Sequence, residues 1–239
     1  MTLDNVISYH TTRKGGLPML CPHRLTIITG HYGTGKTEFA VNLALHMASR
    51  GQTVSLADLD IVNPYFRSRE RRDLLSEHGI RLIASSQACT DADVPSLPAE
   101  LNAILDDRQL TGILDIGGDR VGARVLARYR PRILREDYQL LYVLNANRPE
   151  VRDVSSAISY LRAIESVTGL VCFGIVNNTH LCSETTADDV HKGAALAQAV
   201  SQETGIPVVC HVAHEALAPE LTDLSPLFPI TIRMKKPWE

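Results

Sequence analysis

The chain has 239 residues, 44% of them hydrophobic and 21% charged, which is typical of a globular protein. Its formal net charge of -3 provides no overall attraction to nucleic acid or to anionic membranes, so neither is expected as a partner. No stretch approaches the ~18 consecutive apolar residues of a membrane span, and the N-terminus lacks the apolar core of a secretion signal. The five cysteines are scattered, which is typical of free thiols in a reducing compartment. We therefore expect a cytoplasmic protein.

The segment from Gly30 to Thr37, GHYGTGKT, is a complete G-x-x-x-x-G-K-[ST] phosphate-binding motif. An apolar run at 25–29 precedes it, and a helix-forming run from Glu38 to Arg50 follows it. Glycines in such a loop allow backbone N–H groups to surround an anion at the helix N-terminus. Lys36 would contact the β- and γ-phosphates of a nucleoside triphosphate, and the Thr37 hydroxyl would ligate Mg²⁺. The expected nucleotide contacts are Gly30, His31, Tyr32, Gly33, Thr34, Gly35, Lys36, Thr37 and Glu38.

Beyond this motif the pattern alternates strand and helix almost to the end of the chain. The expected strands are 25–29, 53–57, 81–84, 112–116, 139–144, 170–176 and 207–210, with 230–232 as a further candidate for an edge strand. The expected helices are 38–50, 67–78, 98–107, 121–130, 149–167 and 185–204. Apolar strands between helices predict an α/β fold with a doubly wound, mainly parallel sheet and helices on both faces. Residues 1–23 are expected to form an N-terminal extension, and 24–239 one nucleotide-binding domain.

Two acidic segments follow expected strands, at the sheet edge where ligands gather. Asp60, with Asp58 beside it, follows the second strand, and Asp115 begins a D-x-x-G sequence that ends at Gly118. Asp115 and Asp60 are expected to hold Mg²⁺ with Thr37 and to act with Lys36 in catalysis. Gly118 is expected to donate its N–H to the γ-phosphate. The alternative for each aspartate is a helix cap after a strand, which is a common structural role.

The loop, the acidic segment and the D-x-x-G sequence together resemble the P-loop ATPases grouped as MinD, ParA, CobQ and CobB, which include the nitrogenase iron protein and dethiobiotin synthetase. The resemblance covers about 25–215 and implies a doubly wound parallel sheet, ATP with Mg²⁺, and often an ATP-dependent dimer. In that group the loop commonly reads K-G-G-x-G-K-[ST], and its first lysine reaches the nucleotide of the partner subunit. Here His31 replaces that lysine and Tyr32 the glycine after it, so the motif is atypical.

Asn177 directly follows the sixth expected strand, at the place where guanine-binding proteins carry an N-K-x-D or T-K-x-D element. No such element is present. Asn177 resembles the base-reading asparagine of the ATPase group, and its alternative role is that of a turn asparagine. We therefore expect ATP rather than GTP.

The sequence leaves two functional hypotheses open. The first is a slow ATPase that acts as a nucleotide-gated regulatory or assembly factor, with a protein partner or a second copy of the chain reading the nucleotide state. The second is an ATP-dependent enzyme that activates a small carboxylate, as dethiobiotin synthetase and CobB-type enzymes do. A homodimer would need a cation in place of the missing lysine, for which Arg120 and Arg124 are the first candidates.

Overall fold

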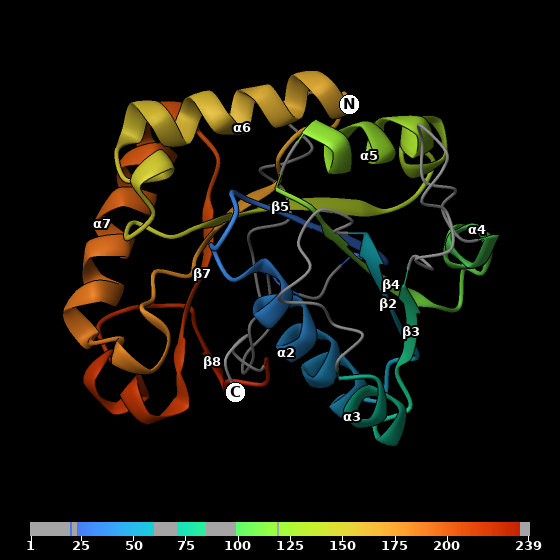
Figure 1. Cartoon of the computed structure of the whole chain (residues 1–239), viewed down its shortest axis with the longest axis horizontal. Coiled ribbons are helices and arrows are strands. Elements are labelled where there is room, and N and C mark those ends of the chain that lie inside the picture. Colours follow the sequence, from blue (N-terminus) through green and yellow to red (C-terminus); the bar gives the residue numbers. More distant parts are fainter. Residues whose placement is uncertain (1–19, 21–22, 60–70, 85–98, 119, 235–239) are drawn as a thin grey trace.

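The computed structural model describes residues 20, 23–59, 71–84, 99–118 and 120–234, which build a sheet of eight strands (Figure 1). The strand order is β3-β2-β4-β1-β5-β6-β7-β8, and every neighbouring pair is parallel. The strands are β1 (Leu25–Thr29), β2 (Val54–Leu59), β3 (Arg81–Ala84), β4 (Thr111–Ile116), β5 (Tyr138–Leu144), β6 (Gly174–Asn177), β7 (Val208–His214) and β8 (Leu227–Ile230). This arrangement confirms the predicted α/β class with a parallel sheet.

Helices cover both faces of the sheet. They are α2 (Lys36–Ser49), α3 (Arg72–Glu77), α4 (Ala99–Asp106), α5 (Arg120–Ile133), α6 (Val154–Thr168) and α7 (Ala187–Thr204), with short 3-10 turns η2 (Pro149–Val151), η3 (Cys182–Glu184) and η4 (Glu215–Glu220). Buried side chains of α2 and of the α3 region share one apolar core with the sheet, and those of α4 to α7 share the other. Figure 1 shows α2 and α3 on the side of the sheet opposite to α5 and α6.

The strands are continuous apolar runs because both of their faces are buried. In β5, for example, Leu140 and Tyr142 pack into the core beneath α4 to α7, while Leu141 and Val143 pack against α2. This alternation follows from the two-residue period of a strand. A strand covered on both sides therefore shows no polar alternation in its sequence.

Three strands differ clearly from the sequence-based expectation. The seventh was expected over 207–210, but β7 extends to His214. The sixth was expected over 170–176, but β6 begins only at Gly174. The backbone N–H of Cys172 instead donates to the Glu165 carboxylate of α6, at 2.8 Å, which diverts this part of the chain from the strand ladder. The last strand ends at Ile230, because residues 231–234 make hydrogen bonds to α2.

The strand order determines which loops meet. Because β1 lies between β4 and β5, the segments that follow these three strands lie together at the carboxyl edge of the sheet. This is the switch point at which ligands bind in doubly wound folds.

Helix α7 packs closely on the end of β6 through Gly193. A Cβ atom added at this glycine would overlap the Thr179 hydroxyl and the Asn177 amide oxygen. Both side chains belong to a buried hydrogen-bond network, in which the Asn177 oxygen accepts from the backbone N–H and the hydroxyl of Thr179 at 3.2 and 2.9 Å.

We predict that Gly193→Ala destabilises the protein, although the same change in an open helix stabilises it by ~1 kcal/mol. The extra methyl group must displace the buried network, and overpacking of this kind costs about 2 kcal/mol. Urea unfolding measures the difference. Ala195→Gly, at an exposed position of α7, measures in the same experiment how much alanine stabilises this helix relative to glycine when packing is not involved. A variant more stable than the wild type would contradict the packing described for α7.

Candidate functional site

The phosphate-binding motif joins β1 to α2, as the sequence predicts. Gly35 adopts a left-handed conformation with φ of 78° immediately before the first residue of α2. A Cβ atom at this glycine would overlap the side chains of Asn178 and His180. Glycine is therefore required here both by the backbone conformation and by the close approach of the loop that follows β6.

The His31 carbonyl organises the interior of the loop. It accepts hydrogen bonds from the Thr34 backbone N–H at 3.2 Å, from the Thr34 hydroxyl at 2.9 Å and from Lys36 Nζ at 3.2 Å. The Lys36 side chain is only 5% exposed. Its ammonium group is therefore held over the curve of the loop, where an anion bound by the loop would lie.

A hydrogen bond links α2 to β4 beside this loop. The Thr37 hydroxyl donates to Asp115 Oδ2 at 2.6 Å, and Asp115 is fully buried. Asp58 on β2 is its register partner and is also buried. Hydroxyl and carboxylate oxygens are the protein ligands that Mg²⁺ takes alongside water and phosphate oxygens, so this set of donors fits that metal. Asp60, the other predicted ligand, lies outside the described residues.

Gly118 brings the D-x-x-G segment into contact with the phosphate-binding loop. A Cβ atom at Gly118 would overlap the Gly30 carbonyl and the Tyr32 backbone nitrogen. The Gly118 carbonyl accepts a hydrogen bond of 2.8 Å from the hydroxyl of Tyr160 on α6. The two loops are thus in direct contact, and a shift of one requires a shift of the other.

His31 and Tyr32, the two departures from the usual motif, face different surroundings. The His31 ring packs edge-on against Tyr160 with a centroid separation of 5.3 Å, and its Nδ1 lies 3.9 Å from a Glu150 carboxylate oxygen. Tyr32 is 53% exposed. The residue that replaces the lysine is therefore held by its own chain, and the aromatic residue after it is open to solvent.

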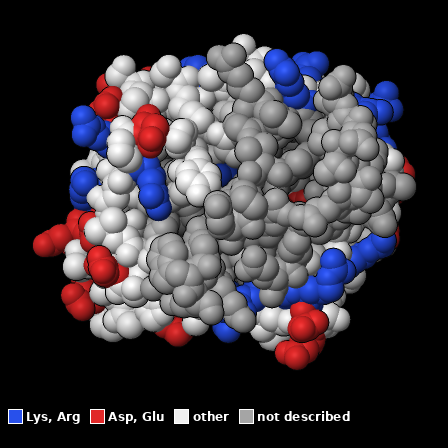
Figure 2. Space-filling view, viewed as in Figure 1, with Lys and Arg blue, Asp and Glu red and all other residues white. Residues whose placement is uncertain are grey.

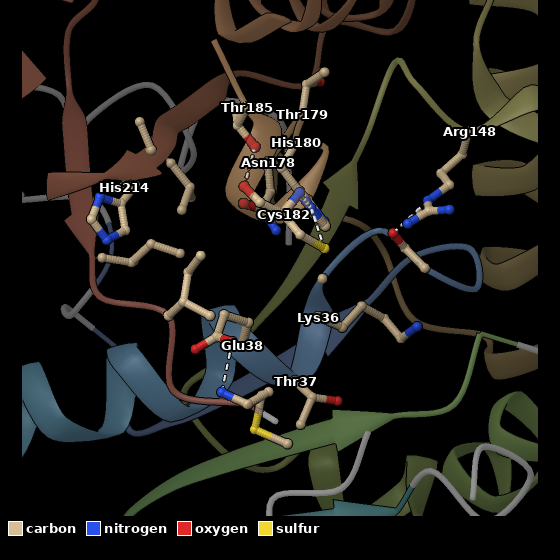
Figure 3. A pocket seen from close by; sticks show the side chains of 17 residues that line it. Lys36, Thr37, Glu38, Arg148, Asn178, Thr179, His180, Cys182, Thr185 and His214 are labelled. Carbon is tan, nitrogen blue, oxygen red and sulfur yellow. Dashed lines mark hydrogen bonds between the residues drawn. The ribbon is translucent and has the colours of Figure 1, made fainter. Parts of the chain in front are cut away.

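Arg148 is a loop contact that the sequence analysis missed. It follows β5, and its Nε donates to the Gly33 carbonyl at 2.7 Å (Figure 3). Its guanidinium lies so close to Gly33 that a Cβ atom there would overlap it. The strand order could have indicated this contact, since β5 lies beside β1. Of the two arginines expected near this site, Arg124 is exposed on α5, and the side chain of Arg120 lies outside the described part of the chain.

A pocket opens beside the phosphate-binding loop, on the side of β6 and β7 (Figure 3). One wall is the loop with the first turn of α2, and another is the segment after β6. Apolar side chains of β7, β8 and the residues after β8 complete it. The lining residues are Gly33, Gly35, Lys36, Thr37, Glu38, Arg148, Asn178, Thr179, His180, Cys182, Thr185, Val212, Ala213, His214, Ile230, Ile232 and Met234.

Asn178 lines this pocket, whereas Asn177 does not. The Asn177 amide is fully buried, where its nitrogen donates to the Val190 carbonyl at 3.0 Å and its oxygen accepts from Thr179. Asn178 Nδ2 instead donates to the Thr34 carbonyl of the phosphate-binding loop at 2.8 Å. Asn177, the expected base-reading residue, therefore does not face this pocket, because strand β6 directs its side chain into the protein and leaves Asn178 on the pocket side.

His180 lies partly buried behind the loop, with its ring Nε2 enclosed by the protein. Burial, with a smaller contribution from the charge of Arg148, lowers the pKa of His180 from 6.5 to about 4. Its Nδ1 lies 3.3 Å from the backbone N–H of Cys182 and can only accept from it, so the ring proton belongs on Nε2, beside Gly35.

Glu38 also lines the pocket, but its carboxylate is already engaged. The two oxygens accept the backbone N–H groups of Arg233 and Met234 at 2.7 and 3.0 Å. Burial, the largest influence, raises the pKa of the Glu38 carboxyl above its usual value, although these hydrogen bonds oppose that shift. Glu38, expected to contact the nucleotide, thus lies at the pocket with both carboxylate oxygens bonded to the backbone of Arg233 and Met234.

On the face shown in Figure 2, described basic side chains lie at separate places around the rim, with acidic ones between them. Within the described parts of the chain, no helix is both long and apolar enough to cross a membrane.

Solved structures share this architecture. The chain aligns with the cell division protein FtsY of Thermotoga maritima at a TM-score of 0.54 and 20% identity, over 86% of this chain and 66% of that one. It aligns with chloroplast FtsY of Physcomitrella patens at 0.53 and 16%, over 86% and 64%, and with FtsY of Mycoplasma mycoides at 0.51 and 16%, over 77% and 57%. It spans less than two thirds of the length of each. No protein-family model and no curated protein sequence matches the chain.

These similarities show the fold. The chain has the α/β fold of the P-loop nucleoside triphosphatases, with the glycine-rich loop between β1 and α2 and a buried aspartate on the adjacent strand β4.

We predict that the neutral state of His180 makes folding stability depend on pH. Because its folded pKa, about 4, lies below its ordinary value of 6.5, the contribution is complete above pH 6.5 and is lost as the pH falls toward 4. By linkage, the wild type should lose about 2 kcal/mol more than His180→Gln between pH 7 and pH 5. Urea unfolding at both pH values measures this. The same substitution at the exposed His78 serves as control, and equal pH dependence in wild type and His180→Gln would contradict the burial argument.

Proposed function

We propose that this protein binds Mg·ATP and hydrolyses it slowly, as a nucleotide-gated regulatory or assembly factor. The observation that carries the proposal is the joint placement of Lys36 and the Thr37–Asp115 hydrogen bond at the N-terminus of α2. A cation for the phosphates and a hydroxyl–carboxylate pair for Mg²⁺ thereby meet at one helix terminus, with its backbone N–H groups.

Within this proposal the residues have separate roles. The glycines and backbone of 30–35 surround the phosphates, and Lys36 exchanges its bond to the His31 carbonyl for phosphate oxygens. Thr37 and Asp115 hold the metal, which supplies charge neutralisation on the phosphates when bound. Gly118, already in contact with Gly30, is placed to transmit the state of the phosphates to α5. Asp60 remains a proposed catalytic residue on sequence grounds.

Adenine is favoured over guanine by the side chains that line the pocket. Guanine presents two N–H donors on one edge, which a carboxylate accepts in proteins that select it. Among the described lining residues Glu38 is the single carboxylate, and its two oxygens accept the N–H groups of Arg233 and Met234. The Asn178 amide donates to the Thr34 carbonyl, and we expect the base to bind on the side of the loop where Asn178 lies.

The assignment to the MinD, ParA, CobQ and CobB group is part of this proposal and rests on the sequence motifs. Slow, intrinsic hydrolysis requires that the cation which stabilises the phosphates come from the same chain. We assign this role to Arg148, because its guanidinium contacts Gly33 of the phosphate-binding loop. The half-exposed Tyr32 at the tip of the loop offers a contact for a protein partner or a second copy of the chain. Such a contact would change whenever the nucleotide reorders the loop.

Lys36→Ala tests the proposal directly. We expect ATP affinity to fall at least about 100-fold, equivalent to ~2.7 kcal/mol, because the lysine charge faces the phosphates. Isothermal titration calorimetry with Mg·ATP, and with Mg·GTP as competitor, measures affinity and base preference. Lys192→Ala is the matched control, since this lysine is exposed on α7 and bonds to Asn147. Wild-type affinity in Lys36→Ala would reject the proposed site, and tighter binding of GTP would reject the choice of adenine.

Arg148→Ala tests the source of the cation. We expect the rate of ATP hydrolysis to fall by roughly 10- to 100-fold, which is less than the roughly 1,000-fold or more that a dedicated arginine finger supplies, with a smaller change in ATP affinity. Arg152→Ala, an exposed arginine four residues further on, should hydrolyse ATP at the wild-type rate. If Arg148→Ala retains the wild-type rate while Arg124→Ala loses it, the cation comes from α5 instead.

A further inference from the structure

The last described residues of the chain are fixed on the helix that follows the phosphate-binding loop. We call residues 230–234 the C-terminal strap. Its backbone N–H groups at Arg233 and Met234 donate to opposite oxygens of the Glu38 carboxylate, at 2.7 and 3.0 Å. Because one carboxylate receives both N–H groups, the position of the strap follows the position of Glu38.

Asn42, one helical turn after Glu38, holds the strap at a second point. Its amide exchanges two hydrogen bonds with the backbone of Thr231, donating to the carbonyl at 3.1 Å and accepting from the N–H at 3.2 Å. The same amide nitrogen lies 3.0 Å from Glu38 Oε1. The strap is thus attached to the side of α2 much as an additional strand would be attached to a sheet edge.

Side chains of the strap form a wall of the pocket beside the phosphate-binding loop. Ile230, Ile232 and Met234 line it from one side, facing the segment after β6 that contains Asn178 and His180. Met234 is almost fully buried, whereas Ile232 is 41% exposed. A flat ring placed between the strap and the 178–182 segment would cover this isoleucine.

Glu38 connects the strap to the phosphate end of the site through a single helical turn. Lys36 and Thr37, proposed to contact phosphate and metal, immediately precede it in α2. A methyl-bearing side chain would pack in this place without the cost of burying a carboxylate. The Glu38 carboxylate instead fixes the direction of two backbone N–H groups. It thereby orients the apolar side chains of the strap that face the pocket.

We propose that the C-terminal strap is part of the binding site for the nucleoside half of the ligand, and that Glu38 is its positioning residue. This inference rests on the proposed nucleotide binding. Ile230, Ile232 and Met234 contact the nucleoside ring system, while the phosphates bind the loop. Docking of the strap and binding of the nucleoside therefore strengthen one another, whereas phosphates alone do not require the strap.

Hydrogen–deuterium exchange of the full chain tests this inference with two probes. Mg·ATP contains a nucleoside, and inorganic tripolyphosphate with Mg²⁺ does not. We expect both probes to slow amide exchange in the 30–38 segment, and only ATP to slow exchange in 230–234, by about tenfold or more, as linkage with a ligand in excess of its Kd requires.

Each other outcome has a defined meaning. Protection by ATP at 30–38 without any change at 230–234 would overturn the role of the strap and leave the proposed function standing. Equal protection of the strap by both probes would overturn the role of the nucleoside. Absence of protection at 30–38 with either probe would overturn the proposed function itself, and this inference with it.

Glu38→Gln isolates the positioning role. The amide keeps the size of the side chain, but its NH₂ group faces a backbone N–H, so one of the two strap bonds is lost. We expect ATP affinity to fall about tenfold, or ~1.4 kcal/mol, with tripolyphosphate affinity within twofold of the wild type. Glu203→Gln, the same change at an exposed position of α7, should alter neither affinity.

Met234→Ala provides an independent check that leaves Glu38 in place. It removes an apolar side chain from the proposed nucleoside wall and should again weaken ATP while sparing tripolyphosphate. Equal losses for both probes in both variants would show that the strap only stabilises the fold. Unchanged ATP affinity in both would also reject the inference.

Discussion

The hydrogen bond from Thr37 to Asp115 is the interaction on which the site depends. It connects the first turn of α2 to the end of β4, and so joins the phosphate-binding loop to the strand that carries the D-x-x-G segment. Because Asp115 is fully buried, the bond is shielded from water, which strengthens a hydrogen bond to a carboxylate acceptor. The positions of Lys36 before it and Glu38 after it follow from the same helical turn.

Local motifs made part of this site predictable from the sequence. The loop of 30–37 and the D-x-x-G at 115–118 are contiguous segments, and each follows an apolar run that forms a strand. Their chemistry could be inferred without knowing the order of strands. The parallel sheet was predictable for a related reason, since strands buried on both faces have no polar alternation.

The rest of the site depends on contacts between segments far apart in the chain. Arg148 reaches Gly33 only because β5 lies beside β1, and the Glu38 carboxylate is engaged by residues almost two hundred positions later. The choice between Asn177 and Asn178 depended on the phase of a strand, because a shift of one residue exchanges the buried and exposed faces. No local pattern distinguishes these possibilities. Arg120 and Arg124 on α5 are four residues apart, a spacing that can be read from the sequence, whereas Arg148 belongs to no such series.

The residues around His31 show what this histidine does at the position where the ATPases that this loop resembles carry a lysine. The ring of His31 packs against Tyr160, whose hydroxyl in turn donates to the Gly118 carbonyl. The phosphate-binding loop, α6 and the D-x-x-G segment are therefore connected inside one chain, at the position from which a lysine would extend toward a partner. Under the proposed function, the same chain supplies the cation for the phosphates through Arg148, which already contacts Gly33. Under the proposed function, Tyr32 on the exposed side of the loop is the contact for another protein, so chemistry and partner recognition would use different residues of the same eight-residue segment.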